Sequence, residues 1–360
     1  MSIPDLQWDG GTAYDLFVSL VVLHRPSDFG VRGPWAAGVR ARLSPENRET
    51  LEKSNLLWTV PFHWIYDLPE PKDATTALWA LSQVAAEERT RLLAFPPDTC
   101  AQVTDLFDRV AARQAWSEGD LEALQAAYQQ PFGHGEGKKP PSAKKAAGIL
   151  DLWARAEEFG EQYLEALRSY QEVFFAEEET RIHPALQAAL ERARKLAEQL
   201  SLLDLLEELT QGVRLDAPPE GEELVLAPSY WSTPLVFMGM ASKKRLVWLF
   251  GARPPDASLV PGEVIPETLL RTLEALSDPT RLRILRDLSE ESLAPAQISR
   301  RLRLRAPTVT HHLKILRLAG LVQLTLDQKD SPRLYATRQE AVSAACDSLK
   351  SFLGKDRHGS

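Results

Sequence analysis

Side chains suited to nucleic acids are concentrated in one short segment near the C-terminus. From Pro307 to Ala319, three apolar residues recur at spacings of four and three, which predicts a helix with one buried face: Val309, Leu313 and Leu316. Hydroxyl, imidazole and cationic side chains point away from that face: Thr308, Thr310, His311, Lys314 and Arg317. Hydroxyls and imidazoles can hydrogen-bond to base edges or phosphates, whereas Lys and Arg neutralise phosphates. We therefore expect this polar face to lie in the major groove of duplex DNA.

The elements before this helix have the spacing of a helix-turn-helix. A short helix is expected from Pro295 to Leu302, and residues 303–305 form a tight turn before the second helix. Gly320 can adopt the left-handed conformation that ends the second helix. Three arginines at the turn are expected to contact the DNA backbone: Arg301, Arg303 and Arg305.

A hairpin follows the second helix. Residues 321–326 alternate like a strand, and residues 333–337 return after a polar turn. Such a hairpin beside a helix-turn-helix is a wing. Lys329 and Arg333, at or beside its tip, are expected to reach the backbone or the minor groove of DNA.

Three further helices flank these elements. Asp278 and Pro279 are a helix cap and a first-turn proline, so a helix is expected to run to Leu288 with Leu282 and Leu285 facing inward. The other two are expected from Thr268 to Leu276 and from Gln339 to Leu353.

Charge separates this region from the rest of the chain. The 360 residues carry a net charge of −8. Residues 265–353 hold 14 Lys and Arg against 10 Asp and Glu, a charge of +4, whereas the remainder holds 28 against 40, a charge of −12. A local basic module is sufficient for DNA binding, because counterion release needs only one basic face. The nine tryptophans all lie outside this module.

The remaining residues predict a mainly α protein with a small antiparallel β element. Residues 1–212 have helical spacing and form a helical N-terminal domain; residues 213–262 have short apolar runs typical of a β-meander and a linker. Residues 265–353 form the winged helix-turn-helix, and residues 354–360 form a tail. No segment has the apolar length of a membrane span and the start lacks a secretory signal, so a cytoplasmic location is expected.

The C-terminal quarter resembles the ArsR/SmtB family of winged-helix regulators. The resemblance rests on LSDPTRLRILRDL, on RRLRLRAPTVTHHLKILRLAGLV and on the hairpin, and it covers roughly residues 267–352. It implies a homodimeric repressor that binds double-stranded DNA and is often released by a metal or a small effector. It also implies that the first and last helices, Thr268 to Leu276 and Gln339 to Leu353, form the dimer contact.

The sequence departs from the metal sensors of that family. Their cysteine pair has no counterpart in residues 292–298, and the last helix offers only Cys346 and Asp347. His311 and His312 diverge by about 100° on a helix and cannot share one ion. We therefore expect no metal and no cofactor.

Three roles for the first 260 residues stay open. They could form an effector sensor, a scaffold for dimerisation and partner docking, or an enzyme fused to a regulator. The enzyme is disfavoured because no catalytic motif is present. The tryptophans fit either an ordinary core or the wall of an effector pocket.

Overall fold

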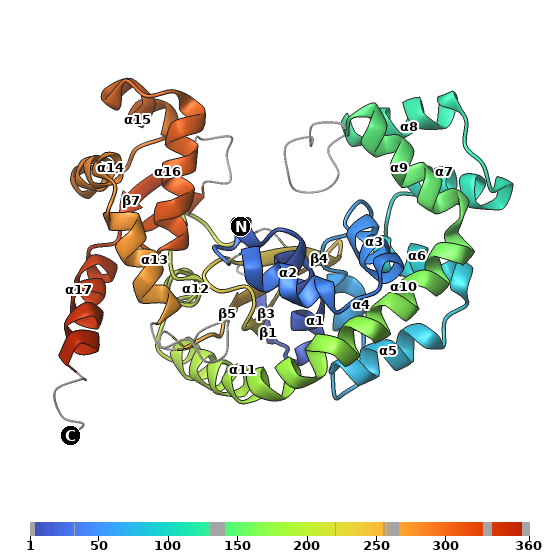
Figure 1. Cartoon of the computed structure of the whole chain (residues 1–360), viewed down its shortest axis with the longest axis horizontal. Helices are drawn as coiled ribbons and strands as arrows, with labels where there is room; N and C mark the ends of the chain where they lie inside the picture. Colours follow the sequence, from blue (N-terminus) through green and yellow to red (C-terminus); the bar gives the residue numbers. More distant parts are fainter. Residues whose placement is uncertain are drawn as a thin grey trace.

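The computed structural model describes residues 4–31, 33–129, 141–219, 221–254, 257, 266–326 and 333–354. A large body occupies the centre of the molecule, and the C-terminal unit from residue 266 onward rises on one side of it (Figure 1). Helices α7 (Ala101–Arg113), α8 (Glu118–Gln129) and α9 (Ala143–Ala154) rise on the opposite side, so the body carries two arms, the C-terminal unit and these three helices (Figure 1).

A four-stranded sheet lies within the body. Its order is β1 (Asp5–Trp8), β3 (Glu223–Ser229), β5 (Arg245–Gly251) and β4 (Phe237–Ser242). β1 and β5 both pair with β3 in parallel, and only β4 is antiparallel to its neighbour β5. The predicted antiparallel pairing therefore holds for β4 and β5, whereas β3 and β5 are parallel, so the strand directions of the sheet are mixed. The runs in β3 and β5 are apolar without alternation because both faces of a parallel strand are buried.

The sheet and the body helices share one hydrophobic core, which contains side chains from Ala13 to Ala252. Side chains on both sides of Gly212 therefore belong to this core. α1 (Thr12–His24) is covered on all sides, with 12 of its 13 residues buried. The other body helices are α2 (Gly33–Ala41), α3 (Pro45–Ser54), α4 (Phe62–Tyr66), α5 (Ala74–Ser82), α6 (Ala86–Ala94), α10 (Ala156–Tyr170), α11 (Ala176–Ala197) and α12 (Leu202–Thr210). A 3-10 turn, Pro26–Asp28, follows α1, and a π-helix, Gln171–Phe175, joins α10 to α11.

The second arm has its own small core. It comprises α7 (Ala101–Arg113), α8 (Glu118–Gln129) and α9 (Ala143–Ala154), packed around Trp153 and Phe107. Five tryptophans of the chain are buried: Trp58, Trp64, Trp153, Trp231 and Trp248. Trp79 is 58% exposed. Among the described residues, no helix is both long and apolar enough to cross a bilayer.

The C-terminal unit has the predicted order of helices and strands and a separate core. It comprises α13 (Glu267–Leu276), α14 (Pro279–Glu290), α15 (Pro295–Leu302), α16 (Ala306–Leu318), β6 (Val322–Leu326), β7 (Leu334–Thr337) and α17 (Gln339–Gly354). One inward residue was predicted wrongly: Leu282 is 48% exposed, and Ile284 is buried in its place. Leu282 lies three residues before the buried Leu285, so spacing alone could not distinguish them.

A short strand of the body joins the wing. β2 (Val213–Leu215) pairs in parallel with β6, which extends the wing to three strands in the order β2, β6, β7. The backbone N–H of Leu324 donates to the carbonyl of Gly212 at 2.7 Å. Arg338 donates from Nη1 to the carbonyls of Gln211 at 2.9 Å and Gly320 at 3.3 Å. Residues 213–216 were expected in the meander, but β2 belongs to this second sheet and connects the body to the C-terminal unit.

Candidate nucleic-acid interface

The turn between α15 and α16 is fixed by local hydrogen bonds. Arg303 ends α15 in the left-handed region, with φ of 55°. The N–H of Leu304 donates to the carbonyl of Ser299 at 3.0 Å, and the Ser299 hydroxyl donates back to the Leu304 carbonyl at 2.5 Å. This loop and Pro307, which lies in the first turn of α16, together set where α16 begins.

α16 has two distinct faces. Val309, Leu313 and Leu316 are buried in the core of the C-terminal unit. The residues predicted to contact bases or phosphates are exposed at four positions: Thr308, Thr310, His311 and Lys314. The Thr310 hydroxyl donates to the Ala306 carbonyl at 3.0 Å, so its oxygen lone pairs remain available to an incoming donor. The periodicity therefore placed the buried face correctly, and the polar face at these four positions.

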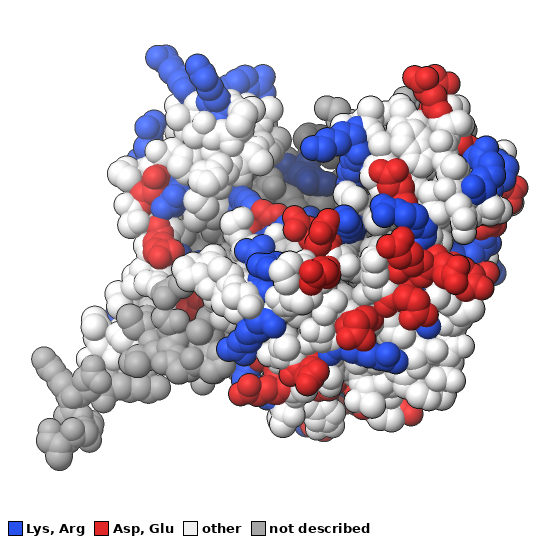
Figure 2. All heavy atoms as spheres, turned by 45° about the vertical axis from the view of Figure 1, so that its right-hand side comes forward, with Lys and Arg blue, Asp and Glu red and all other residues white. Residues whose placement is uncertain are grey.

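The arginines of the turn lie beside this polar face. Arg303 and Arg305 are exposed. Arg301 is also exposed but forms an ion pair with Glu291 at 2.5 Å, so a phosphate would compete with that carboxylate. Figure 2 shows Lys and Arg side chains gathered at the tip of the C-terminal unit.

Arg317 differs from the prediction. Its side chain is half-buried, and burial lowers the pKa of its guanidinium, with the positive charge of Arg333 acting in the same direction. Tyr335 of β7 acts in the opposite direction and raises this pKa. Arg317 therefore lies near the wing rather than on the open polar face. Arg333 itself is exposed just before β7. Lys329 lies outside the described residues.

A body residue contacts the polar face of α16. The Nζ atom of Lys314 lies 2.5 Å from Oδ1 of Asp28, in the 3-10 turn after α1. Both side chains keep nearly half of their surface exposed, at 44% and 45%. An ion pair this exposed is weak, so a DNA phosphate can replace the carboxylate. No pattern in the sequence indicated this contact, because its partners lie 286 residues apart.

Replacing Asp28 with asparagine is expected to tighten DNA binding about two- to fivefold. In this variant Lys314 can bind a DNA phosphate without first breaking its ion pair with the Asp28 carboxylate. Fluorescence anisotropy with a labelled duplex measures the change. Asp108→Asn is the matched control, since Asp108 is 48% exposed and pairs with Arg91 in the body. Equal tightening in both variants would show a general charge effect and contradict the role given to Asp28.

Comparisons with known proteins agree with this geometry. Residues 276–325 match the family model described as a helix-turn-helix domain. The chain is also similar to the uncharacterized HTH-type transcriptional regulator MJ1325 of Methanocaldococcus jannaschii, with 41% identity over 58 residues. That match covers 16% of this chain and 65% of the relative, just under two thirds of its length. The C-terminal unit thus contains a helix-turn-helix domain.

Proposed function

We propose that this protein is a DNA-binding regulator of transcription in which α16 enters the major groove. The exposed polar face of α16 carries the proposal, because its hydroxyl, imidazole and ammonium groups suit base edges and phosphates. The similarity to a helix-turn-helix domain supports it.

The proposal includes a homodimer of the ArsR/SmtB type. α13 packs against α17, and these two helices and α14 carry exposed leucines: Leu273, Leu282 and Leu353. Exposed apolar side chains on adjacent helices favour contact with a second copy. Two recognition helices related by a two-fold axis would read half-sites about one helical turn apart. Binding across a promoter would repress transcription by excluding the polymerase.

The body has a controlling role in this proposal, not a catalytic one. It contacts the C-terminal unit through the β2–β6 pairing and the Lys314–Asp28 ion pair. A ligand that changes the body can therefore alter the position of α16.

The test uses the purified full-length chain and sheared genomic DNA at low salt. We expect the chain to retain a small set of fragments and to protect a pseudo-palindromic site from nuclease digestion. Retention of no fragment, or equal retention of all fragments, would contradict sequence-specific regulation.

Replacing Arg333 with alanine is expected to weaken binding to all duplexes alike and to lower the salt slope of log K by about one. The exposed Arg333 adjoins the wing and can neutralise a phosphate without reading sequence. Anisotropy titrations at several salt concentrations measure the slope. Arg113→Ala, which removes a half-exposed arginine from α7, is the control and should leave the slope unchanged. An unchanged slope in the Arg333 variant would remove Arg333 from the interface.

A further inference from the structure

A buried arginine at the end of β5 lacks most of its hydrogen bonds. Arg253 is only 5% exposed. Its Nη2 donates to the Thr233 carbonyl at 2.9 Å, but Nε and Nη1 have no hydrogen-bond partner among the described residues. Leaving a buried donor without an acceptor is costly, more so when the group is charged. The site is thus suited to an additional acceptor.

The neighbouring carboxylates are engaged with other arginines. Glu178 pairs with Arg181, whose Nε lies 2.9 Å from Oε2 of Glu178. Glu267 accepts from Nη2 of Arg271 at 2.8 Å, and its other oxygen lies 3.9 Å from Nη1 of Arg253. Arg253 therefore has no carboxylate at hydrogen-bond distance among the described residues. Burial lowers the pKa of Arg253 to about 10, and the charge of Arg271 adds to the shift.

The place of Arg253 in the sheet also favours a ligand. It follows β5 at the carboxyl end of the parallel strands, where small molecules bind in open α/β sheets. Tyr230 and Trp231 follow the paired strand β3 at the same edge. The indole Nε1 of Trp231 is buried and likewise has no hydrogen-bond partner among the described residues.

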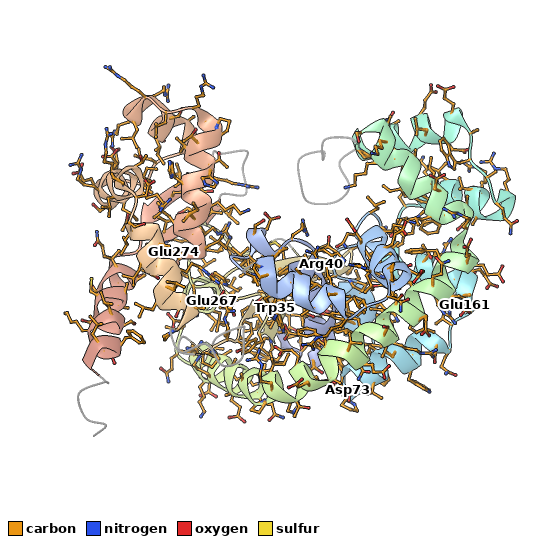
Figure 3. The ribbon with its side chains drawn as sticks, in the orientation of Figure 1. Trp35, Arg40, Asp73, Glu161, Glu267 and Glu274 are labelled. Atoms are coloured by element: carbon orange, nitrogen blue, oxygen red, sulfur yellow. The ribbon has the colours of Figure 1, made fainter. Side chains whose placement is uncertain are left out.

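We propose that Arg253 binds the carboxylate or phosphate group of a small anionic ligand, which takes the place of Glu267. Glu267 is the first residue of α13, at the end of that helix nearest to the body, whereas Glu274 lies further along it (Figure 3). Arg271, on the same helix, donates to the Gly30 carbonyl of the body at 3.1 Å. Arg271 thus connects Glu267 to the body. A ligand that displaces Glu267 therefore loosens α13 from the body and moves the C-terminal unit. This coupling to DNA rests on the proposed function; the binding of the anion does not.

Anion binding is tested by thermal unfolding of the full-length chain without DNA. Sodium benzoate and potassium phosphate are each compared with potassium chloride at the same ionic strength. At about ten times Kd, the anion is expected to raise Tm by about 2 °C. A response to benzoate alone assigns a carboxylate, and a response to phosphate alone assigns a phosphate. No rise above chloride with either anion would overturn the site.

Two variants locate the response. Arg253→Met should abolish it, and the variant should fold because Glu267 keeps Arg271 as its partner. Arg245→Met, at the other end of β5, is the matched control and should keep the wild-type response. Glu267→Gln removes the internal competitor and should bind the anion about fivefold more tightly or better. A response that survives in Arg253→Met, or an unchanged affinity in Glu267→Gln, would overturn the proposal.

Coupling to DNA has a separate readout. Fluorescence anisotropy is measured with a duplex that carries the nuclease-protected site, with and without the anion that raises Tm. The wild type should change its DNA affinity about fivefold or more, and Arg253→Met should not. An anion that raises Tm without changing DNA affinity would overturn the coupling and leave the anion site intact. Absence of DNA binding in anion-free buffer would instead contradict the proposed function.

Discussion

Replacing His311 with alanine is expected to weaken binding to the specific DNA site about five- to thirtyfold and to leave binding to random-sequence DNA almost unchanged. His311 is exposed in the middle of the polar face of α16, where a side chain inserted into the major groove meets base edges. Loss of one such hydrogen bond costs about 1–2 kcal/mol, which corresponds to that loss of affinity. Anisotropy titrations with the specific duplex and with a random duplex of equal length measure the two affinities.

Two histidines serve as controls for this prediction. His183→Ala removes another exposed helical histidine, from α11, and should change neither affinity. His312 is half-buried and its Nδ1 has no hydrogen-bond partner among the described residues, so its replacement tests packing rather than base contact. Equal weakening on specific and random DNA would assign His311 to a phosphate instead of a base.

The C-terminal unit was predictable because its boundaries depend on neighbouring residues. Asp278 accepts a hydrogen bond from the N–H of Arg281 at 2.9 Å, the capping arrangement that its type and position indicate. Pro295 and Gly320 likewise mark ends that depend on one residue each, and Gly320 has φ of 70°. The faces of α16 followed from spacing, since a single helix against one core obeys a simple period.

Contacts between distant segments could not be predicted. β1 contains four residues, too few for a periodic signal, and it pairs with a strand more than 200 residues later. Asp15 resembles a solvent-facing residue in sequence, yet it is fully buried and accepts hydrogen bonds from Ser229, Tyr230 and Trp231. Burial raises the pKa of Asp15 to about 6. Arg317 was misplaced for a related reason, since the position of the wing depends on tertiary packing.

Replacing Leu313 with alanine is expected to lower the free energy of unfolding of the C-terminal unit by about 3 kcal/mol. Leu313 is 2% exposed and belongs to the core that holds α16 in place, together with Ile298 of α15. The lost side chain leaves a cavity in this core, which residues of both α15 and α16 build, so α16 loses its fixed angle to α15. DNA affinity should therefore fall even though Leu313 contacts no DNA. Hydrogen exchange of the α16 amides measures the local free energy.

Leu282→Ala is the matched control for this variant. Leu282 lies on α14 in the same unit but is 48% exposed, so the same substitution should change the free energy of unfolding by less than about 0.5 kcal/mol. If the proposed dimer uses Leu282, this control should weaken self-association while hydrogen exchange in α16 stays unchanged. Equal destabilisation by both substitutions would mean that the two leucines are buried alike, contrary to the packing described for α14 and α16. Retention of full DNA affinity by Leu313→Ala would show that the angle between α15 and α16 does not control recognition, which would contradict the role proposed for α16.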